Sequence, residues 1–155
     1  MLGRPQLASY LVETGQVESE QKAFSKYLGQ GKPGDVHSHW PDIGSAIDVI
    51  RDAGGFAVLA HPVKYRLTRT KLRELLTDFS AAGGTAMEVV CGRQIPSDTR
   101  HMSELCREFG LLASVGSDFH GPGAGYCELG QIPQLDADLQ PVWELFRDSL
   151  AIRGA

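Results

Sequence analysis

Apolar residues recur at helical spacing in two short segments near the start of the chain. Residues 6–13 and 17–28 each carry apolar side chains three or four positions apart, and each segment stops before a glycine, Gly15 or Gly29. Because side chains at this spacing share one face of a helix, the pattern predicts two short helices. The glycines and the proline of residues 29–34 then predict a loop.

Beyond residue 40, amphipathic stretches alternate with short apolar runs. The predicted helices are residues 43–52, 69–82 and 97–109, and the predicted strands are residues 56–60, 86–90 and 111–115. A glycine follows each of these helices directly or one residue later, as is common where helices end. Short apolar runs between helices are typical of buried parallel strands. The pattern therefore predicts an α/β protein with a parallel sheet or barrel, followed by a last amphipathic helix at residues 139–150.

Composition and charge narrow the classes of function. The 155 residues are 42% hydrophobic and 22% charged, the balance of a globular domain. A net charge of −4 argues against a broad basic surface for non-specific nucleic-acid binding, but a local basic pocket for a small anion remains compatible with it. No apolar run approaches the roughly 20 residues of a membrane span, and the first residues lack a signal-peptide pattern.

The cysteines indicate the redox environment. Cys91, Cys106 and Cys127 are an odd number and form no CxxC pair, so the sequence suggests neither a zinc knuckle nor a disulfide framework. We therefore expect reduced thiols and a cytoplasmic location.

Two of the predicted strands end in residues that bind metals in other proteins. His61 follows the first strand, and Asp118 and His120 follow the third. Functional groups of α/β sheets and barrels lie at the carboxyl ends of the strands. Imidazole and carboxylate are usual ligands of zinc, manganese and iron. A lone histidine after a strand is more often a hydrogen-bonded structural residue, but the Asp-x-His pair of Asp118 and His120 at another strand end favours a metal site. Spacing alone therefore leaves a metal site and a structural role equally open.

The same residues resemble the last two metal-binding motifs of the PHP (polymerase and histidinol phosphatase) family. The surrounding sequence is similar to one bacterial subfamily, the nucleoside 3′,5′-bisphosphate phosphatases and the related 5′-to-3′ exoribonuclease. The segments that carry the resemblance are Gly31-Lys32-Pro33, Ala53-Gly54-Gly55, Ala60-His61-Pro62, Met87-Glu88-Val89, Gly116-Ser117-Asp118-Phe119-His120, Leu129-Gly130 and Pro141-Val142-Trp143.

This resemblance implies a distorted seven-stranded β/α barrel, the TIM-like PHP barrel, of which only a part is present. Family members begin with a strand carrying a His-x-His motif, and nothing of that kind precedes Gly3. A β/α barrel normally needs about 200 residues or more. We therefore expect residues 1–34 to form part of a small helical insertion and residues 35–155 to form the C-terminal part of the barrel.

The resemblance also implies a hydrolase that works through divalent metal ions. His61, Asp118 and His120 are the expected metal ligands and catalytic residues. Manganese is the first expectation for the metal, with zinc, iron or magnesium as alternatives. The expected substrate is a nucleotide phosphate ester, either a nucleoside 3′,5′-bisphosphate or the 5′ end of a short RNA, and the sequence does not choose between them.

Three cationic residues are candidates for binding the substrate phosphate that is not cleaved: Arg4, Lys32 and Arg93. Arginine suits bidentate phosphate recognition, although a solvated surface charge explains each of the three equally well. Lys64 and Arg66, which follow the first histidine motif, are interpreted as surface residues.

Two further features leave alternatives open. Glu88 lies inside a predicted apolar strand, where a carboxylate without a partner is costly. It either orients a metal ligand or pairs with a buried arginine or lysine. His37 and His39 have the His-x-His form of the first family motif, but they follow the insertion, so metal binding by them is the lesser alternative.

Three hypotheses for function follow. The chain is part of a phosphoesterase that is active when complete, or a catalytically inactive remnant or interaction module, or a small metalloprotein completed by His37 and His39. A barrel that lacks its first strands has exposed sheet edges, which invite association. We therefore expect the chain either to form a homo-oligomer or to be poorly soluble, with no membrane partner.

Overall fold

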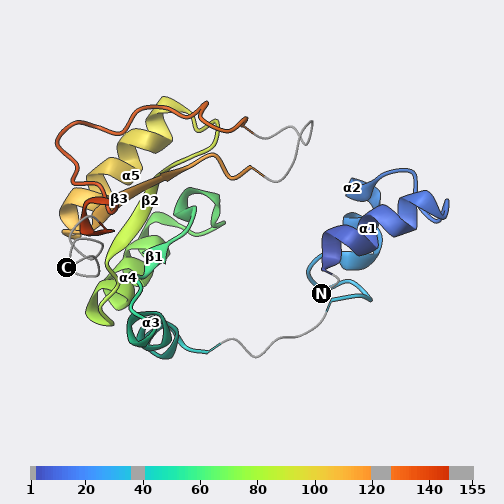
Figure 1. The fold of residues 1–155 in the computed structure, drawn as a ribbon, viewed down its shortest axis with the longest axis horizontal. Coiled ribbons are helices and arrows are strands. Elements are labelled where there is room, and N and C mark those ends of the chain that lie inside the picture. The colour runs from blue at the N-terminus through green and yellow to red at the C-terminus, as the bar shows by residue number, and fades with distance from the viewer. Residues whose placement is uncertain (1–2, 36–40, 120–126, 147–155) are drawn as a thin grey trace, which may run out of the picture. The chain divides into compact units, whose positions relative to one another are not determined.

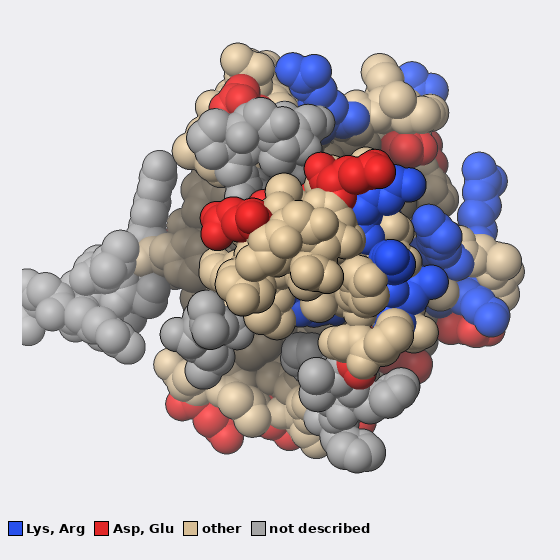
Figure 2. Space-filling view, turned by 90° about the vertical axis from the view of Figure 1, so that its right-hand side faces the viewer, with Lys and Arg blue, Asp and Glu red and all other residues tan. Residues whose placement is uncertain are grey.

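The chain forms two compact units in a computed structural model that describes residues 3–35, 41–119 and 127–146 (Figure 1). The first unit is Met1–Trp40 and the second is Pro41–Ala155. Among the described residues, no helix is long and apolar enough to cross a membrane. The face drawn in Figure 2 carries both Lys or Arg and Asp or Glu side chains, in keeping with the modest net charge.

The first unit is a small helical assembly, as the apolar spacing predicts. It contains α1 (Arg4–Glu13), α2 (Glu20–Ala23) and a π-helical turn η1 (Phe24–Leu28). The second predicted helix begins at Glu20 because Ser19 caps it, accepting a hydrogen bond from the backbone of Lys22 at 3.3 Å. Ala8, Ala23 and Leu28 form the small buried core of this unit.

The second unit alternates helix and strand. Its elements are α3 (Ile43–Asp52), β1 (Val58–Leu59), the 3₁₀ turn η2 (Pro62–Lys64), α4 (Arg69–Ala81), β2 (Ala86–Cys91), α5 (Pro96–Glu108) and β3 (Leu112–Gly116). Asp42 and Thr68 cap the first turns of α3 and α4 with their side chains. Gly83 and Gly110 follow α4 and α5 with φ of 91° and 61°, which only glycine adopts readily. The predicted alternation of elements is thus confirmed.

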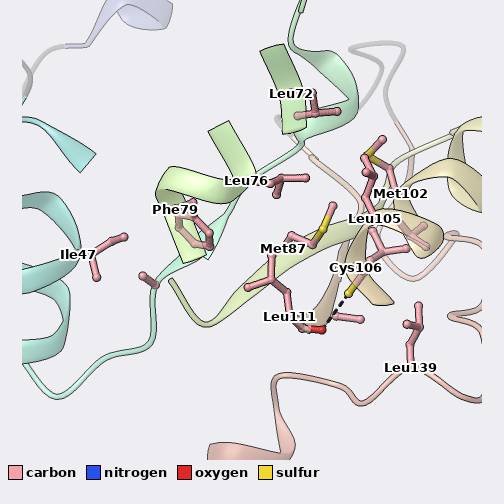
Figure 3. Packing of buried hydrophobic residues seen from close by; sticks show 14 residues of the cluster. Ile47, Leu72, Leu76, Phe79, Met87, Met102, Leu105, Cys106, Leu111 and Leu139 are labelled. Atoms are coloured by element: carbon pink, nitrogen blue, oxygen red, sulfur yellow. Dashed lines mark hydrogen bonds between the residues drawn. The ribbon is translucent and has the colours of Figure 1, made fainter. Parts of the chain in front are cut away.

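The three strands form a parallel sheet in the order β1-β2-β3. Crossovers between parallel strands are right-handed in nearly all proteins, and with strands in consecutive order this rule puts α4 and α5 on the same face of the sheet. Leu76 of α4, Met87 of β2 and Leu105 of α5 are packed in one buried cluster (Figure 3). The α/β class and the parallel sheet are therefore confirmed.

Two elements differ from the prediction by more than a residue or so in the second unit. The first predicted strand, residues 56–60, shortens to β1 (Val58–Leu59). The predicted helix at residues 139–150 is wrong at its start, since the described helical residues begin at 144. Pro141 instead forms a bridge with Ala113 of β3, and the Ala113 N–H donates to Gln140 O at 2.9 Å. Pairing with the edge of β3 thus takes residues that the apolar spacing assigned to the helix.

Candidate functional site

His61 lies just beyond the end of β1, in a conformation that is rare for residues other than glycine. Its φ of 35° and ψ of 50° are left-handed, and it caps the turn η2, which begins at Pro62. Its ring meets the ring of Tyr65 edge to face, with centroids 5.9 Å apart. The Nδ1 atom is buried and has no hydrogen-bond partner among the described residues. A buried polar atom of this kind needs a partner, and a metal ion is one.

Glu88 of β2 holds the backbone of His61. Its Oε2 accepts a hydrogen bond from the His61 N–H at 2.6 Å, and bonds to carboxylates are shorter than those between neutral groups. The sequence left open whether this carboxylate orients a metal ligand or pairs with a cationic side chain. Its contact in the described structure is to the backbone of an expected ligand, which favours the first interpretation.

Asp118 follows β3 and also has a left-handed backbone, with a φ of 53°. Its Oδ2 accepts from the Nζ of Lys64, in the turn just after His61. This bridge joins the end of β1 to the end of β3. Lys64 is exposed, as the sequence interpretation expects, and it also pairs with Asp118. Its position three residues after a histidine at a strand end was the available signal for this contact.

The electrostatics of this region combine negative charge with partial burial. Burial alone would lower the pKa of Lys64, but hydrogen bonding and charge from Asp118, with a contribution from Cys91, raise it on balance. Burial raises the pKa of Cys91, and the charge of Glu88 raises it further, while Lys64 opposes this. Burial also raises the pKa of Tyr65, again with help from Glu88. The protonated form of Lys64 is therefore favoured beside Asp118.

The donor set fits part of a metal site. An unpartnered imidazole nitrogen and a carboxylate are the ligand types that zinc, manganese and iron prefer. Within residues 3–35, 41–119 and 127–146, however, no group of three histidine, cysteine, aspartate or glutamate side chains is placed to hold an ion. His120, His37 and His39 lie outside the described residues, so their predicted roles stay predictions.

The three candidate phosphate-binding cations lie in different places. Arg93 is exposed and follows β2, in the same unit as His61 and Asp118. Arg4 and Lys32 belong to the first unit, where the Nη1 of Arg4 donates to the carbonyl of Leu28 at 3.5 Å. Their roles toward a substrate stay predictions.

Known proteins of similar sequence are bacterial hydrolases. The chain is 43% identical over 143 residues to a 5′-3′ exoribonuclease of Haemophilus influenzae, a match covering 92% of this chain and 52% of that protein. It is 40% identical over 143 residues to a 3′,5′-nucleoside bisphosphate phosphatase of Chromobacterium violaceum, covering 92% and 50% respectively. The chain thus spans about half the length of these relatives. No protein-family model matches it.

Solved structures support the same relationship. An amidohydrolase from Chromobacterium violaceum, solved with bound sulfate, gives a TM-score of 0.80 at 38% identity, covering 96% of this chain and 51% of that chain. A protein of Bifidobacterium adolescentis, described as a candidate metal-dependent phosphoesterase, gives 0.67 at 26% identity, covering 96% and 50%. The resemblance seen in the sequence is therefore confirmed, and the chain is a homologue of these bacterial phosphoesterases over about half of their length.

Proposed function

We propose that this chain is part of a metal-dependent phosphoesterase that hydrolyses nucleotide phosphate esters, either nucleoside 3′,5′-bisphosphates or the 5′ ends of short RNAs. The observation that carries the proposal is the buried Nδ1 of His61, which has no hydrogen-bond partner among the described residues, at the same carboxyl end of the sheet as the carboxylate of Asp118. The relatives are named for an exoribonuclease and a bisphosphate phosphatase, which supports both substrate classes.

The proposed fold is the C-terminal part of a distorted seven-stranded PHP barrel, formed by residues 35–155, with residues 1–34 as part of a helical insertion. The three parallel strands in consecutive order, with both crossover helices on one face, suit an arc of such a barrel. The ends of β1, β2 and β3 then form one sector of the rim, where the functional groups of barrels gather.

His61, Asp118 and His120 would hold the metal, with further ligands from outside the described residues. When bound, divalent ions polarise phosphoryl oxygens and lower the pKa of a coordinated water. Manganese is proposed first, with zinc, iron or magnesium as alternatives. Glu88 keeps His61 in place, and Lys64 limits the uncompensated negative charge of Asp118.

Arg93 is proposed to bind the phosphate that is not cleaved. It is exposed just after β2, one residue beyond Gly92, whose N–H donates to Gly116 O at 2.8 Å. That contact keeps the turn carrying Arg93 next to the end of β3. Arg4 and Lys32 are proposed for the same purpose because the sequence places them in the insertion. A cytoplasmic location and self-association complete the proposal.

A second candidate is a catalytically inactive remnant or interaction module. The observation that favours it is that the described residues hold no group of three ligands. Metal content and activity separate the two candidates, because an inactive remnant has no reason to keep an ion that depends on His61.

The experiment pairs elemental mass spectrometry with phosphate release from a nucleoside 3′,5′-bisphosphate in added manganese. It compares the full chain with His61→Ala and with the control His101→Ala. His101 lies on α5, with its Nδ1 4.0 Å from Oε2 of Glu104. We expect bound metal in the chain and in His101→Ala and a loss of metal in His61→Ala. Turnover that follows the metal supports a site completed within this chain or its oligomer. Equal metal content in all three proteins would refute the proposed site.

A further inference from the structure

The carboxylate of Glu88 lies where charge is costly unless it is paired. It belongs to the middle strand of the sheet, between buried Met87 and buried Val89, and is itself half-buried. A carboxylate in such a place is retained only with strong hydrogen bonds. The His61 N–H supplies one, at 2.6 Å from Oε2.

Gly116 of β3 leaves the space that this carboxylate fills. A Cβ added at Gly116 would lie 2.3 Å from Oε1 of Glu88, far inside van der Waals contact. The φ of Gly116 is not positive, so its backbone conformation does not require glycine. Glycine is needed there for room alone, since any side chain would displace the Glu88 carboxylate.

The backbone of His61 is held in a conformation that it would not adopt freely. A left-handed histidine needs its surroundings to fix it, and the His61 N–H donates a hydrogen bond across the sheet to Glu88. The same residue carries the buried Nδ1 that has no partner among the described residues. Because both features belong to His61, a contact that fixes its backbone also limits where its imidazole ring can lie.

We propose that Glu88 is a positioning residue that fixes the left-handed backbone of His61, and so its imidazole, from the neighbouring strand, in the space that Gly116 leaves open. Its role toward a metal rests on the proposed function. The effect of Glu88 on the geometry of His61 does not depend on the proposed function and can be observed without any metal. Glu88 is not assigned as a ligand, because one of its oxygens accepts from the backbone and the other lies against Gly116.

The test uses three variants of the full chain. Glu88→Ala removes the acceptor, Glu88→Gln keeps an acceptor of the same shape without the charge, and Gly116→Ala keeps the charge but displaces it. The matched controls are Glu104→Gln, an exposed carboxylate on α5, and Gly44→Ala, within α3. Circular dichroism identifies any variant that fails to fold, in which case the other two decide.

The first readout is NMR of His61 without metal. We expect the His61 amide to exchange about tenfold to a hundredfold faster in Glu88→Ala and Gly116→Ala, as loss of a bond to a charged group implies, with a smaller change in Glu88→Gln. The imidazole ¹⁵N shifts of His61 should move with it. Both controls should match the parent chain. His61 signals that stay unchanged in all three variants would overturn the proposal.

The second readout is manganese affinity by calorimetry. Loss of a residue that orients a ligand weakens binding about tenfold to a hundredfold, and Glu88→Gln should recover part of the loss. Weaker binding in Glu88→Gln with unchanged His61 signals would make Glu88 a direct ligand and overturn the positioning role. If the parent chain binds no manganese, the proposed function fails, while the NMR readout still decides the role of Glu88.

Discussion

His61 and Asp118 share a left-handed backbone although neither is glycine, with φ of 35° and 53°. Such conformations cost on the order of 1–3 kcal/mol each and persist where the surroundings determine them. Here the surroundings are specific: Glu88 holds the backbone of His61, and Lys64 binds the carboxylate of Asp118. Strained backbone and charged side chains therefore lie together at the ends of the strands, as is common at functional sites.

The Lys64–Asp118 pair gives stability a defined pH dependence. Because the pKa of Lys64 is raised from 10.5 in the folded chain, its contribution is fully present below that pH and is lost as pH rises through the folded pKa. With Lys64 at 41% side-chain exposure, the contribution is about 0–1 kcal/mol. Urea unfolding should show Lys64→Met less stable than the parent at pH 8, with the difference shrinking above about pH 10.5. A difference that grows there would contradict the pairing; Lys71→Met, on α4, serves as control.

Cys106 should be a poorly reactive thiol. Burial raises its pKa to about 11, so the thiolate is scarce at neutral pH. Its Sγ also donates to the carbonyl of Leu111 at 3.1 Å (Figure 3). Alkylation at pH 8, followed by mass spectrometry, should label Cys106 far more slowly in the folded chain than in urea. Equal rates would show that this part of the core opens readily.

Much of the second unit could be predicted from sequence because its elements follow local rules. Short, mostly apolar runs between helices predicted β2 and β3, and glycines such as Gly83 and Gly110 marked where α4 and α5 end. The final helix was predicted too early because helical spacing does not register that Pro141 can pair with Ala113. A contact between residues so distant along the chain has no local signal.

At the candidate site, the sequence predicted which residues are candidate metal ligands, but it did not predict which side chains contact those residues. Strand ends identified His61 and Asp118, whereas the partners Glu88 and Lys64 reach them across 27 and 54 sequence positions. Lys64 is the exposed residue that the sequence indicated, but its contact with Asp118 was not predicted, because only the fold shows that its turn faces the end of β3.

The shared core of α4 and α5 should carry much of the stability of the second unit. Leu76 is fully buried against the sheet, so Leu76→Ala should cost about 2–5 kcal/mol by removing contacts and leaving a cavity. Leu67 is 41% exposed, and Leu67→Ala should change stability by about 0.5 kcal/mol or less. Urea unfolding of both variants measures this. Equal losses would mean that α4 does not rest on the sheet.

At the scale of the whole molecule, the two edges of the sheet are unequal. The edge of β3 is partly paired, since Val142 N–H donates to Ala113 O at 2.9 Å. On the other side, β1 has two residues and pairs only with β2 among the described strands. Unpaired edges invite pairing with other chains. We therefore expect the proposed self-association to occur through the edge formed by β1.

Sedimentation velocity tests this association. The full chain should associate increasingly as its concentration rises, and Val58→Lys should reduce the association, because lysine on an edge strand opposes pairing. Val58 is 36% exposed, so the substitution leaves the core intact. Val49→Lys, at an exposed position on α3, is the control. A parent chain that remains monomeric at all concentrations would contradict the proposal.

The central claim is that the strand ends of this chain form part of a metal site, and manganese binding followed by electron paramagnetic resonance tests it most directly. Free manganese is counted during titration of the parent chain, His61→Ala and His101→Ala. The account predicts saturable binding to the parent and to His101→Ala, with affinity about tenfold or more weaker in His61→Ala. Identical titration curves for all three proteins, whether they show binding or none, would contradict it.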